Sequence, residues 1–173
     1  MGSRFSLHEL PLSERGSSIP EFAWLTSERL ASLAGAEQLV FDLRSLDPDK
    51  FSFPYHFHHN AEELFVILEG MALLRTPKGI EEVQAGDLLF FEIGPTGAHQ
   101  LYNHTDAPCR YLDIRTKREL DVVEYPDSNK LNVLMDVQRV FDKNQQVDYL
   151  KGEADVREKW KAIGHLYPAK EEE

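Results

Sequence analysis

Eight short strand-like runs follow one another between residues 38 and 116, with no helical segment between them. The runs read QLVFDLRS, PYHFHH, ELFVILEG, MALLRT, IEEVQ, DLLFFEI, AHQLYNHT and CRYLDIRT. Turn-forming residues such as Asp47-Pro48, Pro77-Lys78-Gly79 and Gly94-Pro95 separate them. Because short strands at regular spacing are typical of antiparallel sandwiches and barrels, the sequence predicts an all-β domain.

The strand-rich region has a different texture from the segments on either side of it. We expect a β-barrel over residues 38–125, an N-terminal extension over 1–37 and a C-terminal extension over 126–173. The N-terminal extension is expected to hold a short helix over 26–34, with Thr26 or Ser27 as its cap. The C-terminal extension includes ADVREKWKAIGHLY, which is expected to form a second short helix. A chain of 173 residues has room for one such domain with its flanks.

The charge balance excludes several classes of partner. The chain carries 19 lysines and arginines against 30 aspartates and glutamates, a formal net charge of −11, whereas binding to nucleic-acid phosphates needs dense positive charge. No run approaches the roughly 18 apolar residues of a membrane span, and no secretion signal is visible, so we expect a cytoplasmic protein without membrane contact. Cys109 is the single cysteine, which excludes an intrachain disulfide, and we expect it to be a small buried hydrophobic residue.

A cluster of histidines and glutamates stands directly against an apolar run in PYHFHHNAEELFVILEG, residues 54–70. Side chains two apart in a strand point to the same side, so His56 and His58 face one way, and a short turn returns Glu63 to that side. These groups are costly to bury without a partner, but they are normal ligands of a divalent metal ion. A fourth ligand is expected from a distant strand, where His99 follows the turn at Gly94–Gly97.

Two motifs resemble those of a known family. His56-x-His58-x4-Glu63-x6-Gly70 resembles the first motif of the cupin superfamily, and Gly86 through Pro95-x-Gly97-x-His99-x3-Asn103 resembles the second. The segment from Gly86 to Pro95 is longer than the usual pattern, and Gly97 to His99 is one residue shorter. The resemblance, which is to single-domain bacterial cupins, implies one small jelly-roll barrel, the double-stranded β-helix. It also implies His56, His58, Glu63 and His99 as metal ligands and Asn103 as a structural residue at a strand end.

Neighbouring polar residues offer alternatives to this ligand set. Strand parity turns His59 away from His56 and His58, which favours a supporting or surface role. Glu62 replaces Glu63 if the turn is one residue tighter, although the six-residue interval from Glu63 to Gly70 argues against this. His104 stands at a turn and is expected to be exposed.

The residues that line a substrate pocket are harder to select. We name Tyr55, Phe65, Arg75, Tyr102 and Arg115 as candidates. An arginine inside a barrel presents a planar fork suited to a carboxylate, although surface placement is the commoner outcome for such arginines. The aromatic candidates are equally suited to the barrel core.

Three imidazoles and a carboxylate suit one divalent transition metal, Zn, Fe, Mn, Ni or Cu, and leave positions open for water or substrate. One hypothesis is a metal-dependent oxygenase, isomerase or lyase acting on a small carboxylate, sugar or aromatic compound. The other is a binding or sensing module in which the metal only anchors a ligand or the barrel. Fold resemblance does not select between them. A homodimer is expected from the resemblance. The N-terminal 36 residues and the C-terminal extension are candidates for exchange across the dimer, and the YPDS segment of the extension is alternatively a candidate for folding over the barrel mouth.

Overall fold

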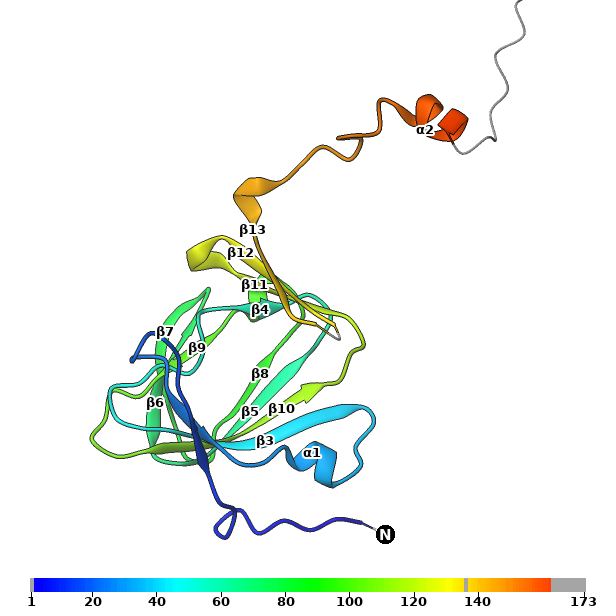
Figure 1. Cartoon of the computed structure of the whole chain (residues 1–173). Coiled ribbons are helices and arrows are strands. Elements are labelled where there is room, and N and C mark those ends of the chain that lie inside the picture. Colours follow the sequence, from blue (N-terminus) through cyan, green and yellow to red (C-terminus); the bar gives the residue numbers. More distant parts are fainter. Residues whose placement is uncertain (1, 136, 163–173) are drawn as a thin grey trace, which may run out of the picture. The chain divides into compact units, whose positions relative to one another are not determined.

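The computed structural model describes residues 2–135 and 137–162, and the chain divides into two compact units, Met1–Lys143 and Asn144–Glu173. Three antiparallel sheets build the first unit and curve around a common interior (Figure 1). The six-stranded sheet has the order β1 (Ser13–Arg15), β2 (Trp24–Thr26), β3 (Leu39–Leu46), β10 (Cys109–Thr116), β5 (Glu63–Glu69), β8 (Leu88–Phe91). The three-stranded sheet has the order β7 (Gly79–Gln84), β6 (Met71–Thr76), β9 (Gln100–Tyr102). The four-stranded sheet has the order β13 (Arg139–Asp142), β12 (Lys130–Leu134), β11 (Asp121–Tyr125), β4 (Phe57–His58).

Helical segments are short. The first unit contains α1 (Leu30–Leu33) and the single-turn helices η1 (Pro95–Gly97) and η2 (Pro126–Ser128). A further turn, η3 (Lys143–Gln145), lies at the boundary of the two units, and α2 (Val156–Ala162) belongs to the second. The prediction of an all-β fold is therefore confirmed. Among the described residues, no helix has the length and apolar character needed to cross a bilayer.

The alternation along β5 explains how one strand serves both surfaces of the barrel wall. Glu63, Phe65 and Ile67 are buried, while Leu64 and Val66 between them are half-buried. The inward apolar side chains join a core drawn from the six-stranded and three-stranded sheets. That core comprises Leu46, Phe65, Ile67, Ala72, Leu74, Val83, Phe91, Leu101, Cys109 and Tyr111. Cys109 is fully buried, and burial raises the pKa of its thiol to about 11, so it is the inert hydrophobic residue that we expected.

Two motif glycines are required by close backbone approaches. A Cβ at Gly97 would lie 1.9 Å from the carbonyl oxygen of Glu92, so the turn η1 that precedes His99 cannot form with any larger residue. Gly70 has a φ of +75°, and a Cβ there would lie 2.4 Å from the carbonyl oxygen of Pro108. These two glycines fix the turns that follow β5 and precede β9.

The N-terminal helix is shorter than the sequence predicts, because strand pairing takes its first residues. Thr26 ends β2, and the backbone and hydroxyl of Ser27 both hydrogen-bond to Leu43 on β3. The helix begins at Leu30 after Arg29, with no side-chain cap. The expectation of a cap at Thr26 or Ser27 was therefore wrong.

Both predicted extensions contribute strands to the barrel sheets. From the N-terminal side, β1 and β2 add to the sheet beside β3. From the C-terminal side, β12 and β13 extend the sheet that begins with β4 and β11. Of the predicted C-terminal helix, Val156–Ala162 is helical, Ala154 and Asp155 form a turn before it, and residues 163–167 lie outside the described residues.

Candidate metal centre

Four polar side chains from three separate segments meet inside the barrel. His56 precedes β4, His58 ends it, Glu63 begins β5, and His99 precedes β9. His56 and His99 form an isolated antiparallel bridge, in which each backbone N–H donates to the other's carbonyl oxygen, at 3.3 and 2.9 Å. The bridge holds the two cupin-like motifs in register.

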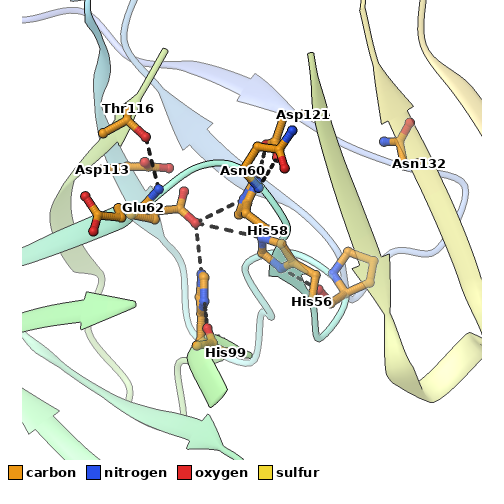
Figure 2. Close-up of polar contacts among 12 residues, drawn as sticks. His56, His58, Asn60, Glu62, His99, Asp113, Thr116, Asp121 and Asn132 are labelled. Carbon is orange, nitrogen blue, oxygen red and sulfur yellow. Dashed lines mark hydrogen bonds and ion pairs between the residues drawn. The ribbon is translucent and has the colours of Figure 1, made fainter. Parts of the chain in front are cut away.

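The three imidazoles lie around one carboxylate oxygen. The distances from Nε2 to Glu63 Oε2 are 3.9 Å for His56, 3.4 Å for His58 and 3.2 Å for His99. Potential ligand atoms of His56, His58 and Glu63 lie within 4.8 Å of one another, and His99 joins them through Glu63. All four residues are at most 6% exposed. Figure 2 shows His56, His58 and His99 converging from different segments of the chain.

Backbone carbonyls fix the orientation of two of the rings. His56 Nδ1 donates to the carbonyl oxygen of Pro54, and His99 Nδ1 donates to that of Gly97, both at 2.9 Å. A carbonyl oxygen can only accept, so Nδ1 carries the proton and Nε2 of the neutral ring presents a lone pair. In the described part of the chain, Glu63 Oε2 and His99 Nε2 have no hydrogen-bond partner.

The protonation states leave this arrangement short of positive charge. Burial lowers the pKa of His56 to about 3, so this ring is neutral at pH 7. Burial opposes the charge on Glu63, but its contacts with His58 and His99 hold the pKa well below its usual range. The buried Glu63 carboxylate therefore stays charged and needs a cation beside it, either a protonated His58 or a metal ion. A divalent metal ion takes these atoms as ligands, so the residues fit one.

Asp121 holds the third ring. Its Oδ2 lies 2.5 Å from His58 Nδ1, and its Oδ1 accepts a hydrogen bond from the backbone N–H of Asn60 at 3.2 Å (Figure 2). Burial alone lowers the pKa of His58, but Asp121 and Glu63 outweigh it and raise the pKa to about 9. Binding a metal at Nε2 therefore displaces a proton. A carboxylate behind a ligating histidine fixes its ring and increases its basicity.

Aromatic side chains close the centre on its inner side. Phe91 stacks on His99 with ring centroids 3.6 Å apart, and Phe65 meets the same ring edge-on at 5.3 Å. Both phenylalanines belong to the barrel core. They keep water away from one side of the centre and fix the position of His99.

A cavity of about 380 Å³ opens beside the centre. His56, His58 and Glu63 form part of its wall, and its other charged lining residues are Arg29, Asp42, Arg44, Asp113 and Arg115. Tyr125, Asn132 and Leu134 on the hairpin of β11 and β12 line it as well. Arg115 is thus the one predicted pocket residue that reaches this cavity.

Arg75 and Tyr55, two of the other candidates, lie elsewhere. The Arg75 guanidinium donates to both carboxylate oxygens of Asp127, at 2.6 and 2.8 Å, in an exposed pair. Tyr55 is buried beneath it, with the guanidinium carbon 4.0 Å from the ring centroid. These residues hold the turn η2 against the barrel wall and do not line the cavity.

Tyr102 and Phe65 also lie outside the cavity lining. Tyr102 stacks on Phe51 with centroids 4.4 Å apart and donates its hydroxyl to Asp49 at 2.9 Å. Phe65 is a core residue whose contact with the centre is the edge of His99. The structure therefore brings together the four predicted metal ligands and one of the five predicted pocket residues.

Three residues outside the predicted site form one polar wall of the cavity. This Arg44 cluster comprises Asp42 and Arg44 on β3 and Asp113 on β10. Asp42 and Arg44 are two apart in LVFDLRSL, and Asp113 and Arg115 are two apart in CRYLDIRT. Charges repeated with period two inside an apolar strand indicate an inward polar face, and this signal was available in the sequence.

The polar neighbours of the ligands are exposed. His59 points away from the centre and contacts Glu124 at 3.1 Å. Glu62 is exposed, whereas Glu63 is buried against the imidazoles. His104 is exposed and contacts Glu82 at 3.1 Å.

Asn103 is fully buried and donates to the carbonyl oxygens of Leu46 and Ala107, the structural arrangement that the second motif implies.

The fold and the site define a class: an antiparallel β-barrel with three histidines and one glutamate gathered inside it. Residues 43–115 match the family model described as the Cupin domain. This segment is therefore a cupin domain, and recognition of the cupin superfamily from the two motifs is confirmed.

Solved structures share this fold at low sequence identity. A protein proposed to be a sugar phosphate isomerase from Acidithiobacillus ferrooxidans is 22% identical, with a TM-score of 0.71 over 81% of this chain and 88% of that one. A sugar phosphate isomerase of a cupin superfamily from Silicibacter pomeroyi is 23% identical, with a TM-score of 0.71 over 86% and 98%. A predicted oxalate decarboxylase from Thermotoga maritima is 16% identical, with a TM-score of 0.56 over 67% and 100%. No curated protein matches the chain.

Proposed function

We propose that this protein is a metal-dependent enzyme that acts on a small molecule in the cavity beside its candidate metal centre. The observation that carries the proposal is the buried Glu63 Oε2, which has three imidazole Nε2 atoms around it and no hydrogen-bond partner in the described structure. His56, His58, Glu63 and His99 would hold one divalent transition metal. Such an ion supplies a Lewis acid that polarises a carbonyl or lowers the pKa of bound water.

The chain's own residues prepare the site in three ways. Backbone carbonyls orient His56 and His99, and Asp121 orients His58. Core aromatics exclude water from the inner side. The Arg44 cluster and Arg115 place charged groups on the cavity wall, where a bound molecule can reach them. A barrel that used the metal only for stability has no need of these charges, which favours an enzyme.

The similar structures direct the choice of reactions to test. Two carry the name sugar phosphate isomerase and one the name oxalate decarboxylase, so interconversion of aldose and ketose phosphates and release of carbon dioxide from oxalate come first. Uptake of dioxygen with aromatic substrates completes the panel. These reactions cover the isomerase, lyase and oxygenase classes that a centre of this composition can support.

The test begins with metal content. The protein is loaded separately with Mn, Fe, Ni, Cu and Zn, and metal per chain is measured by plasma mass spectrometry before each assay. We expect one ion per chain and turnover with at least one metal, both lost in His58→Ala and retained in His59→Ala. A metal-supplemented protein that holds no ion would contradict the metal proposal.

The second candidate function is a binding or sensing module. It takes precedence if every metal-loaded form is inactive across the panel while a small molecule co-purifies with the protein. The cavity of about 380 Å³ is compatible with either function.

We further propose that the chain forms a homodimer. β8 is an edge strand of its sheet, with Leu88 and Phe90 exposed at 64% and 54%, and such an edge is normally covered. Light scattering of the wild type and of Phe90→Lys tests this assembly. A monomeric wild type would contradict it.

A further inference from the structure

We infer that the cavity beside the metal centre recognises a polyhydroxylated molecule of monosaccharide size through Asp42, Arg44 and Asn132. The inference rests on the proposed function, because the ligand is placed in the same cavity as the metal. It narrows the substrate from a carboxylate, a sugar or an aromatic compound to a sugar-like polyol.

Two neighbouring strands, β3 and β10, build the Arg44 cluster. Asp42 and Asp113 are partners in the register of β3 and β10, and Arg44 lies two residues from Asp42 on the same side. Arg44 Nε lies 2.7 Å from Asp113 Oδ2, but its N–H does not point along that line, so the contact is an ion pair without a hydrogen bond. Arg44 Nη2 lies 3.7 Å from Asp42 Oδ2. The three side chains are 15%, 8% and 7% exposed for Arg44, Asp42 and Asp113.

Two buried acceptor atoms in the cavity lining have no hydrogen-bond partner in the described structure. Asp42 Oδ1 has no hydrogen-bond partner in the described structure. Asn132 Oδ1, on β12 in a different sheet, is also buried without a partner, and its residue lines the same cavity. Figure 2 shows Asn132 on a strand separate from those of the histidines. A buried acceptor without a partner costs folding free energy, so both atoms call for hydrogen-bond donors.

The candidate ligand classes differ in whether they can donate hydrogen bonds to these acceptors. Carboxylates and aromatic hydrocarbons offer no donor to these acceptors, whereas each hydroxyl group of a polyol both donates and accepts. Arg44 Nε, on the same strand as Asp42, supplies an unused donor in the wall of the cavity, so the hydroxyl groups of a polyol can serve all three groups. Hydroxyl groups on the ligand would therefore supply the missing hydrogen-bond partners of the cavity lining.

The charged residues and the size of the cavity also restrict the ligand. The cavity lining contains three arginines, Arg29, Arg44 and Arg115, three carboxylates, Asp42, Glu63 and Asp113, and His58, so it offers contacts to a neutral polyol and to an attached anionic group alike. A second cavity, of about 570 Å³, shares Arg29, Asp42, Arg44 and Phe53 with the first and leaves room for a substituent. The two cavities together therefore fit a polyol, either free or carrying a phosphate group.

Binding to the zinc-loaded protein tests the inference without requiring turnover. The probes are D-glucose, D-fructose, their 6-phosphates, succinate and benzoate, followed by isothermal titration and saturation-transfer NMR. We expect a sugar or its phosphate to bind at least about tenfold tighter than succinate and benzoate. Preference for the phosphates over the free sugars would assign the second cavity to the phosphate group, and equal binding would assign recognition to the hydroxyls alone; both outcomes support the inference.

A matched pair of substitutions isolates the acceptor. Asn132→Asp keeps an acceptor oxygen at the position and is expected to retain sugar binding, whereas Asn132→Leu is expected to weaken it about tenfold. Asp42→Leu, on a different sheet, removes the second acceptor and is also expected to weaken binding about tenfold. Asp106→Asn, at an exposed loop position, serves as the control. Circular dichroism confirms folding of each variant before titration.

Zinc content separates failure of the inference from failure of the proposed function. If the wild type binds no zinc, the proposed function fails. If zinc is bound but succinate or benzoate binds as tightly as every sugar, the polyol inference is overturned. Unchanged sugar affinity in both Asn132→Leu and Asp42→Leu, in folded and zinc-loaded protein, overturns the assigned residues.

Discussion

The candidate metal centre and the Arg44 cluster are two buried polar groups that line one cavity but are completed in different ways. Around Glu63, the neighbouring groups are imidazoles whose other nitrogens are already bound to carbonyls or to Asp121. Around Arg44, the neighbouring groups are carboxylates that compensate its charge. Although burial alone lowers it, these carboxylates raise the pKa of Arg44, so the guanidinium stays charged.

The difference shows what each group requires from outside the chain. The metal centre has a buried carboxylate and three imidazole nitrogens gathered around it, so a metal ion that replaces the proton on His58 completes it. The Arg44 cluster contains its own counter-ions, because the guanidinium lies against two carboxylates, and Asp42 Oδ1 and Arg44 Nε still lack hydrogen-bond partners, so a hydroxylated molecule completes it. Each of the following changes should affect one group more than the other.

Arg44→Met is expected to have the largest effect, on folding. It leaves Asp42 and Asp113 buried without their counter-ion, and breaking a buried ion pair in this way lowers the free energy of unfolding by about 3–5 kcal/mol. Urea denaturation of the variant and the wild type measures the loss. The metal centre uses none of these atoms, so the folded fraction should still bind one zinc ion.

The exposed Arg139→Met serves as the control for this loss, with an expected change below about 0.5 kcal/mol. The double variant Arg44→Met/Asp113→Leu also removes one of the two carboxylates left without a counter-ion, so it should regain part of the stability, while Asp42 stays buried and unpaired. If the single variant is as stable as the wild type, the Arg44 cluster contributes no compensated charge, and its contrast with the metal centre fails.

Glu63→Gln is expected to have the largest effect on metal binding. It removes the single negative charge among the four proposed ligands, so affinity should fall by more than about 100-fold, the upper end of what residues behind the ligands contribute. Competition with a chelator measures the affinity. Glu62→Gln is the matched control and should bind metal like the wild type, because Glu62 is exposed. The reverse result would make Glu62 the ligand.

Asp121→Asn comes next, because it acts through His58 without contacting the metal. Loss of the carboxylate behind a ligating histidine typically weakens metal binding by about 10–100-fold. Glu124→Gln is the control, since Glu124 contacts the exposed His59 in the equivalent way. The same chelator competition applies to both variants, and equal affinities would show that His58 needs no orientation by Asp121.

The sequence predicted the metal centre better than the cavity, and the reason is physical. His56, His58, Glu63 and His99 stand at fixed spacings around glycines that are required for close backbone contacts, so the pattern is local and restrictive. Asp121 contributes from 63 residues away through one hydrogen bond, and no short-range pattern marks it.

The placement of the arginines could not be predicted either, because it also depends on contacts that are distant in the sequence. Arg75 and Arg115 were chosen and Arg44 was not, although all three occur in strand-like runs. Their placement depends on which face of each strand turns inward and on which acid lies opposite. The pairing of β3 with β10 decides this for Arg44, and the turn η2 decides it for Arg75. The strand pattern predicted the barrel because alternation is a local property, whereas the cavity wall depends on long-range register.

Asp127→Asn tests the weakest of the charged pairs and completes the comparison with Arg44. Arg75 and Asp127 make two short hydrogen bonds, yet their side chains are 41% and 53% exposed. Water screens such a pair, so the free energy of unfolding should fall by at most about 1 kcal/mol, with no change in metal or sugar affinity.

The pH dependence gives this small effect a distinctive sign. Arg75 holds the pKa of Asp127 below its ordinary value, so the pair stabilises the fold above the unfolded pKa of about 3.9 and loses this contribution as the pH falls. The difference between the wild type and Asp127→Asn should therefore be largest near pH 7 and shrink toward pH 4 and below. A loss approaching that of Arg44→Met would mean that exposure does not separate the two arginines, and the difference would then have to come from the number of carboxylates that each one contacts.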